Sequence, residues 1–172
     1  MKKRFHLLSL FVIALLCTNL SKAEPLDVGA DAPDIKTLDQ KGNPVDLGKE
    51  LSKGISLVYF YPKADTPGCT KQACNIRDEF ESVTKAGIKV FGVSADTPED
   101  QLAFAEKFEL PFTLLADKKG EVIAAFGVPA NEKGFASRQS FLVKDGKIIW
   151  RDLKATPTTQ AEDAIAAAKA NN

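Results

Sequence analysis

Residues 55–95 read ISLVYFYPKADTPGCTKQACNIRDEFESVTKAGIKVFGVSA, and this stretch decides the fold. Residues 55–62 form a nearly continuous apolar run rich in β-branched and aromatic side chains, which predicts a buried central strand. Residues 69–87 carry apolar side chains at three- and four-residue steps and end on Gly87, which predicts a helix. Residues 88–95 predict a second buried strand. Strand, helix and strand in this order predict two parallel strands joined by a right-handed crossover.

The flanking segments extend this unit on both sides. Residues 34–47 predict a β-hairpin around Lys41-Gly42-Asn43. After residue 95 we expect a helix opened by Thr97 and Pro98, then a strand at 111–117, a short helix at 121–128, a hairpin of 137–143 with 147–153, and a final alanine-rich helix. This order predicts an α/β protein with a thioredoxin-like fold, in which a mixed central sheet is flanked by helices and preceded by an N-terminal β-hairpin.

The first 23 residues have the pattern of a secretory signal peptide. Residues 2–4 are basic, residues 7–16 are apolar, and Ser21 and Ala23 place small side chains at the −3 and −1 positions of a cleavage site. We therefore expect residues 1–23 to be a leader that is cleaved near Ala23. The protein would then be exported to the periplasm or cell envelope, and residues 24–172 would form a single domain.

Two other interpretations of the leader stay open. A retained anchor is disfavoured because the apolar run is shorter than the roughly 20 residues that span a bilayer. A lipoprotein would use Cys17, but Leu16 is large for the position before an acylated cysteine.

Cleavage would change the composition in two ways. Four of the 23 Lys and Arg residues lie in the leader, so 19 would remain against 23 Asp and Glu, a net charge of −4. No basic patch points to nucleic acid. His6, the one histidine, would also leave, which excludes Ser-His-Asp and Cys-His catalysis and imidazole-based zinc or copper sites. We expect no cofactor and no metal.

Cys69 and Cys74 would then be the remaining cysteines. Cys69 lies at the start of the predicted helix that follows the first buried strand. The unpaired N–H groups and positive dipole end of a helix's first turn stabilise a thiolate. The Thr66 hydroxyl can orient a sulfur or a bound oxygen, and Gly68 lets the backbone approach closely. A buried, inert cysteine at a helix start is the alternative for Cys69.

The pattern P-x-x-x-T-x-x-C, formed by Pro62, Thr66 and Cys69, resembles the active-site motif of peroxiredoxins. Arg138, just before a late FLV strand, is similar in place to the active-site arginine of that family. The C-x4-C spacing of Cys69 and Cys74 resembles the peroxiredoxin Q or bacterioferritin-comigratory-protein subfamily. The resemblance covers nearly all of the chain after the leader and implies a thiol peroxidase that acts on hydrogen peroxide and organic hydroperoxides.

The resemblance also implies a role for each residue. Cys69 would be the peroxidatic cysteine that becomes a sulfenic acid. Arg138 would stabilise the thiolate and the charge that develops on the peroxide oxygens. Thr66 and the Cys69 backbone N–H would position the peroxide, and Pro62 would shield it from water. Cys74 would be the resolving cysteine; a small core residue is the alternative for Cys74, and a surface ion pair is the alternative for Arg138.

The spacing of the two cysteines has a geometric consequence. Residues five apart in a helix rise about 7.5 Å, so their Cα atoms lie on the order of 8–9 Å apart, whereas a disulfide needs at most about 7 Å. A Cys69–Cys74 disulfide therefore requires the helix to unwind, and we expect residues 66–77 to melt on oxidation.

Two other functions compete with a peroxidase. An envelope thiol–disulfide oxidoreductase or thioredoxin-like electron carrier would leave Thr66 and Arg138 without a role. A copper-delivery module of thioredoxin-like fold would want C-x3-C and a histidine. For the peroxidase we expect a thioredoxin-like protein reductant, no nucleic acid partner and no stable membrane insertion after cleavage. We expect a monomer and leave a dimer open.

Some conspicuous residues have plainer interpretations. We expect three aromatic side chains to pack in the hydrophobic core: Trp150 on its strand, and Phe104 and Phe108 on their helix. We expect Asp96 and Glu99, which lie near a helix start, to act as capping charges.

Overall fold

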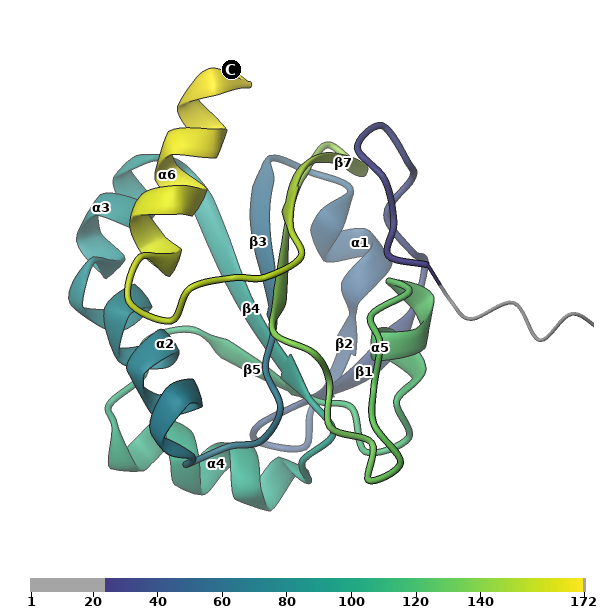
Figure 1. Cartoon of the computed structure of the whole chain (residues 1–172), viewed down its shortest axis with the longest axis vertical. Helices are drawn as coiled ribbons and strands as arrows, with labels where there is room; N and C mark the ends of the chain where they lie inside the picture. Colours follow the sequence, from purple (N-terminus) through teal and green to yellow (C-terminus); the bar gives the residue numbers. More distant parts are fainter. Residues whose placement is uncertain (1–23, 172) are drawn as a thin grey trace, which may run out of the picture.

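The structure is a computed structural model that describes residues 24–171, and it shows a seven-stranded mixed sheet with helices on both faces (Figure 1). The strands are β1 (Lys36–Asp39), β2 (Pro44–Asp46), β3 (Ile55–Phe60), β4 (Ile88–Ser94), β5 (Thr113–Ala116), β6 (Gln139–Lys144) and β7 (Lys147–Asp152). The helices are α1 (Leu47–Leu51), α2 (Pro67–Asp78), α3 (Phe80–Lys85), α4 (Pro98–Lys107), α5 (Glu121–Ala125) and α6 (Gln160–Ala170). The predicted α/β fold with its N-terminal hairpin is confirmed. The predicted leader at 1–23, with Cys17, lies outside the described residues.

The sheet order is β2-β1-β5-β4-β3-β6-β7, with β3 parallel to β4 and antiparallel to β6. Every residue of β3 is buried, because helices cover both of its faces. Leu57 and Tyr59 join the hydrophobic cluster beneath α2, α3, α4 and α6, while Val58 and Phe60 join the cluster beneath α1 and α5. The apolar run of β3 thus supplies both halves of the core.

The crossover between β3 and β4 departs from the prediction in one respect. The single helix predicted over 69–87 is two helices, α2 and α3, separated at Glu79 (φ −97°, ψ 13°). Phe80, the first residue of α3, packs against Phe112 with ring centroids 6.0 Å apart. No glycine or proline marks this break, so the sequence carried no local signal for it.

The C-terminal half follows the prediction. β6 and β7 form an antiparallel hairpin whose two turn residues, Asp145 and Gly146, have φ angles of 47° and 80°, as a two-residue turn of this kind requires. α6 packs on the same face of the sheet as α2 and α3 (Figure 1). The start of α6 is thereby brought against α2.

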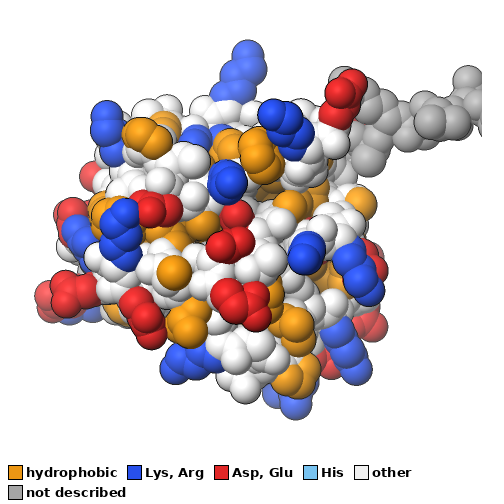
Figure 2. Space-filling model, turned by 90° about the horizontal axis from the view of Figure 1, so that it is seen from below, with side chains coloured by type: hydrophobic (Ala, Val, Ile, Leu, Met, Phe, Trp, Pro, Cys, Tyr) orange, Lys and Arg blue, Asp and Glu red, His pale blue; other side chains and the backbone are white. Residues whose placement is uncertain are grey.

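The short helix α1 was not predicted, since its five residues show too little periodicity. Trp150, Phe104 and Phe108 pack in or against the cluster beneath α2, as expected. No helix within residues 24–171 has both the length and the apolar character to cross a membrane. On the face seen in Figure 2, basic and acidic side chains are interspersed.

Candidate active site

Cys69 lies in the first turn of α2, as the sequence predicted. The helix begins at Pro67 with Thr66 as its N-cap residue, so Cys69 is the third helical residue. Its side chain is only 2% exposed and packs in the cluster beneath α2. The N–H groups of this turn have no partner within the helix, and the positive end of the helix dipole lies here. Helix starts of this kind are general sites of anion stabilisation.

The sheet topology brings Arg138 to Cys69 across 69 positions of sequence. Arg138 directly precedes β6, and β6 runs antiparallel to β3 with Gln139 opposite Phe60. The first residue of β6 therefore lies where β3 ends and the loop to α2 begins. Arg138 Nη2 donates to Cys69 Sγ at 3.4 Å. A Cβ on Gly68 would lie 3.2 Å from Nη2, so glycine leaves room for the guanidinium.

A chain of buried polar groups continues from Arg138. Its Nη1 donates to Gln72 Oε1, Gln72 Nε2 donates to Gln160 Oε1 at 2.7 Å, and Ser140 Oγ donates to the same oxygen at 2.7 Å. Gln72, Gln160 and Ser140 are all essentially inaccessible to solvent. The chain links β6, α2 and α6, so the orientation of Arg138 depends on how α6 packs.

Loop 62–66, which precedes Cys69, is tied to β4 and α4. The Ala64 backbone N–H donates to Asp96 Oδ2 at 2.8 Å, and Lys107 Nζ contacts Asp65 Oδ2 at 2.6 Å. Thr66 Oγ1 donates to the Lys63 carbonyl at 2.9 Å. The loop thus has a defined shape beside the sulfur.

The predicted role of Asp96 as a capping charge is wrong. Thr97 caps α4, accepting a hydrogen bond from the Asp100 N–H at 3.2 Å, whereas the Asp96 side chain turns inward and holds loop 62–66. Asp96 is buried, and its Oδ2 also accepts a hydrogen bond from Ser94 Oγ at 2.6 Å. Glu99 does serve the helix start, where a backbone N–H bond and then the Thr97 hydroxyl lower the pKa of its carboxyl.

The hydrogen bonds of Asp96 continue to the sheet. Gln101 Nε2 donates to Ser94 Oγ at 2.8 Å, and the Tyr61 hydroxyl donates to Gln101 Oε1. Burial raises the pKa of Tyr61, and burial followed by the neighbouring Tyr61 raises the pKa of Tyr59, whose ring stacks on it at 5.5 Å. Both phenols therefore stay neutral at physiological pH, and Tyr61 remains a hydrogen-bond donor.

Cys74 lies on the same helix as Cys69, is half-buried, and is free, as Cys69 is. The next residue, Asn75, contacts α6. Its Oδ1 accepts from the Ala161 N–H at 2.9 Å, and its Nδ2 donates to Thr158 O at 3.1 Å and Glu162 Oε2 at 3.2 Å. Asn75 thus fastens the turn of α2 that carries Cys74 to the start of α6.

The structure brings Cys69 and Arg138 into contact and places Thr66 and half-buried Pro62 in the adjoining loop. It keeps Cys74 a turn and a half further along α2. Gln72, Gln160 and the inward role of Asp96 were not predicted from the sequence. The three-residue step from Cys69 to Gln72 on a helix could have revealed Gln72. No local pattern marks Gln160.

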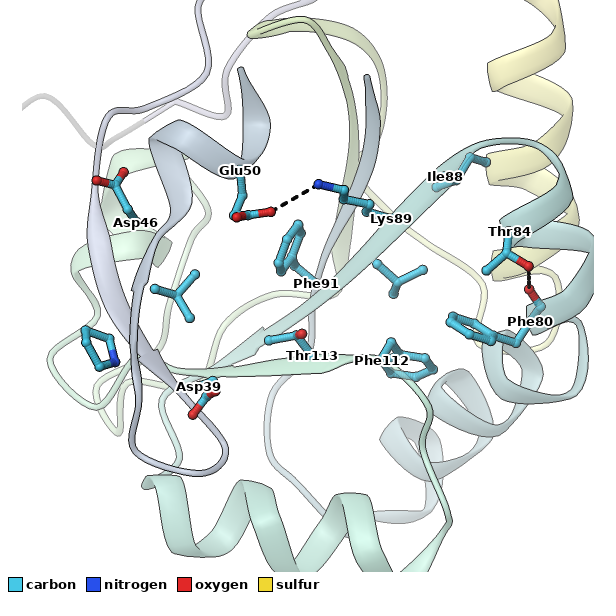
Figure 3. A pocket seen from close by; sticks show the side chains of 13 residues that line it. Asp39, Asp46, Glu50, Phe80, Thr84, Ile88, Lys89, Phe91, Phe112 and Thr113 are labelled. Atoms are coloured by element: carbon cyan, nitrogen blue, oxygen red, sulfur yellow. Dashed lines mark hydrogen bonds and ion pairs between the residues drawn. The ribbon is translucent and has the colours of Figure 1, made fainter. Parts of the chain in front are cut away.

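A groove of about 500 Å³ is lined by residues of the β1–β2 hairpin, α1, α3 and β4 (Figure 3). It forms because β5 begins opposite Phe91 and leaves the first half of β4 without a neighbour on that side. Lys89 and Glu50 form an ion pair in its wall at 3.2 Å. The lining contains no cysteine. Among residues 24–171, no three His, Cys, Asp or Glu side chains group as a metal site would require.

Comparison with known proteins assigns residues 28–151 to the AhpC/TSA family. Peroxiredoxin Bcp of Escherichia coli is 45% identical over 142 residues, which cover 77% of this chain and 90% of that protein. The chloroplastic peroxiredoxin Q of Sedum lineare is 43% identical over 122 residues, covering 70% of this chain and 65% of that protein. The chain thus spans a little less than two thirds of the chloroplastic relative.

Solved structures agree with these matches. Peroxidoxin BcpB from Mycobacterium tuberculosis has a TM-score of 0.79 and 33% identity, covering 84% of this chain and 97% of that chain. The bacterioferritin comigratory protein of Xanthomonas campestris has a TM-score of 0.74 and 26% identity, covering 85% and 97%.

Proposed function

We propose that this chain, which belongs to the AhpC/TSA family and within it to the peroxiredoxin Q and Bcp group, is a thiol-dependent peroxidase that reduces hydrogen peroxide and organic hydroperoxides. The observation that carries the proposal is the contact between the Arg138 guanidinium and the buried Cys69 sulfur, 3.4 Å apart at a helix start. The relative from Xanthomonas campestris is described as having alkyl peroxide reduction activity, which supports the same substrate class.

Cys69 is the nucleophile of the proposed reaction. Its thiolate attacks a peroxide oxygen, so an S–O bond forms while the O–O bond breaks and the sulfur loses two electrons. The released alkoxide or hydroxide takes a proton from solvent and leaves as alcohol or water. Cys69 becomes a sulfenic acid. Arg138, which stays charged at any working pH, stabilises both the thiolate and the charge on the leaving oxygen.

Loop 62–66 forms the other side of the peroxide site. Because the Thr66 hydroxyl donates to the Lys63 carbonyl, its oxygen is free to accept the peroxide O–H. The Cys69 backbone N–H donates to a peroxide oxygen, and Pro62 limits the access of water. These contacts hold the peroxide in line with the sulfur.

Cys74 resolves the sulfenic acid in the second step. Its thiolate attacks the Cys69 sulfur, an S–S bond forms while the S–O bond breaks, and the released hydroxide takes a proton from solvent and leaves as water. Both cysteines lie within the continuous helix α2, where residues five apart are on the order of 8–9 Å apart at Cα, too far for a disulfide. The helix must therefore unwind between the two steps.

The buried side chains of α2 suggest a shorter unwound segment than the predicted 66–77. Ile76 is fully buried, and exposing it costs about 1.5–3 kcal/mol. Arg77 Nη1 also donates to the Phe108 carbonyl at 2.8 Å. Unwinding that stops before Ile76 releases Cys69 and Cys74 and keeps both anchors.

A thioredoxin-like dithiol protein would reduce the disulfide by thiol–disulfide exchange, which returns two electrons and two protons to the pair. We further propose that residues 1–23 direct export and are cleaved near Ala23, so that this reductant is an envelope protein. Determining the N-terminal residue of the protein purified from the cell envelope tests cleavage; a chain that retains Met1 in the cytoplasm would contradict it.

Peroxide consumption by the chain with an excess of dithiothreitol tests the proposed function. Cys69→Ser should abolish consumption, because serine cannot supply the thiolate. In wild-type protein, one equivalent of peroxide should consume both thiols and yield a disulfide between Cys69 and Cys74, seen by peptide mass spectrometry. Full peroxide turnover by Cys69→Ser would refute the proposal. A wild-type protein that exchanges disulfides but ignores peroxide would favour the oxidoreductase instead.

A further inference from the structure

The buried hydrogen-bond chain from Arg138 to α6 contains an unusual feature at its far end. Gln160 is 1% exposed, and its Nε2 has no hydrogen-bond partner among the described residues, while its Oε1 accepts two hydrogen bonds. A buried donor without a partner is unfavourable, because it loses its hydrogen bond to water on folding. The orientation of this amide therefore needs an explanation.

The direction of the chain supplies that explanation. Arginine has donors only, so Gln72 must present its oxygen to Arg138 and its NH₂ group to Gln160. Gln160 must then present its oxygen to Gln72, and the Ser140 hydroxyl donates to that same oxygen. Turning the Gln160 amide around would place its NH₂ group against the NH₂ group of Gln72. The Nε2 of Gln160 is therefore left without a partner because the Arg138 guanidinium has donors only.

The chain closes on itself through the backbone. Ser140 lies two residues after Arg138, so both side chains emerge on the same side of the same extended segment. Gln72 comes from α2 and Gln160 from α6. Three elements thus fix one guanidinium, and α6 supplies the acceptor that fixes Gln72.

We propose that Gln160 is a positioning residue for the Cys69 site: it holds Gln72, which holds Arg138 against the Cys69 sulfur. Gln160 does not touch the reacting atoms. Because Gln72 lies in the segment of α2 that unwinds, the same contact must break before Cys74 reaches Cys69. Gln160 therefore favours the reactive form of the site and opposes the resolving form. The positioning of Arg138 by Gln160 does not depend on the proposed function; the opposite effects on Cys69 oxidation and on disulfide formation rest on it.

The test is Gln160→Met, which keeps the length and the helix preference of the side chain but removes the acceptor. Asp163→Asn is the matched control, since Asp163 accepts from Thr159 Oγ1 at 2.7 Å at the same helix end, outside the chain. The readout is the rate of Cys69 alkylation by iodoacetamide against pH, measured with Cys74→Ser in all proteins. This readout needs no peroxidase activity, so it can fail or succeed independently of the proposed function.

With Gln160→Met, the alkylation profile should move to higher pH, and the rate of oxidation by hydrogen peroxide should fall about tenfold, because Arg138 is less well placed. With Cys74 present, disulfide formation after oxidation should not slow. Asp163→Asn should leave both rates unchanged. If Gln160→Met does not fold, Gln160→Asn draws the oxygen away from Gln72 while keeping the amide, and the same shifts are expected. A folded Gln160 variant with the wild-type profile and oxidation rate would overturn the proposal.

Discussion

Two segments flank Cys69, and they are held in different ways. Loop 62–66, before it, is tied by the Ala64 N–H to the buried carboxylate of Asp96. The first turns of α2, after it, are tied to α6 by the amides of Gln72 and Asn75. The Asn75 bonds to the Thr158 carbonyl and the Glu162 carboxylate are exposed, so water competes with them. A hydrogen bond to a charged group contributes about 1.5–3 kcal/mol, and a neutral one about 0.5–1.5 kcal/mol.

The difference shows how one helix start can serve two steps. The segment that shapes the peroxide site has the stronger, buried anchor and should stay in place. The segment that carries Cys74 has weaker anchors, some of which can exchange for water. Substitutions on the two sides should therefore affect different steps.

Among these substitutions, Cys74→Ser, in the segment of α2 that unwinds, should have the largest effect on turnover. Oxidation of Cys69 by one equivalent of peroxide should proceed at the wild-type rate, because loop 62–66 and Arg138 are untouched. Steady-state turnover with a dithiol protein reductant should fall about a hundredfold, since an intramolecular step becomes bimolecular. Stopped-flow oxidation and coupled turnover measure the two steps. Undiminished turnover would remove Cys74 from the mechanism.

Asp96→Ala tests the fixed side. The Ala64 N–H and the Ser94 hydroxyl would lose a buried acceptor, so the free energy of unfolding should fall by about 3 kcal/mol. Oxidation of Cys69 should slow as the loop loosens. Glu106→Ala is the control, because this exposed carboxylate of α4 makes no side-chain hydrogen bond or ion pair among the described residues, and it should change stability by less than about 0.5 kcal/mol. Urea unfolding of both variants provides the measurement. Equal stability of the two would show that Asp96 does not anchor the loop.

Asn75→Ala should give the smallest effect. It removes the contacts to α6, so the free energy of unfolding should fall by about 1 kcal/mol. Disulfide formation after oxidation should become several-fold faster, while oxidation itself keeps its rate. Alanine is the better helix former, so faster unwinding can be attributed to the lost contacts with α6. Lys71→Ala, on an exposed position of the same helix, is the control. Slower disulfide formation in Asn75→Ala would contradict the comparison.

Much of this arrangement could be predicted from the sequence. The apolar runs and three- and four-residue steps of residues 55–95 predicted the strand–helix–strand crossover, because the spacing of apolar residues within each segment indicates a strand or a helix. The motif of Pro62, Thr66 and Cys69 and the distant Arg138 came from resemblance to a family. The contact between Gln72 and Gln160 spans 88 positions, and it exists because α6 packs beside α2. Asp96 was expected to be a capping charge because an acidic side chain near a helix start interacts favourably with the helix dipole. Its inward turn depends on the packing of loop 62–66, which no local pattern shows.

Hydrogen exchange on reduced and peroxide-oxidised protein tests the central claim most directly. The amides of residues 70–75 should be protected in the reduced form and exchange rapidly in the disulfide form. The Ala64 amide, bonded to Asp96, should keep its protection in both. Equal protection of residues 70–75 in the two redox states would contradict the claim that the first turns of α2 unwind to join Cys69 and Cys74.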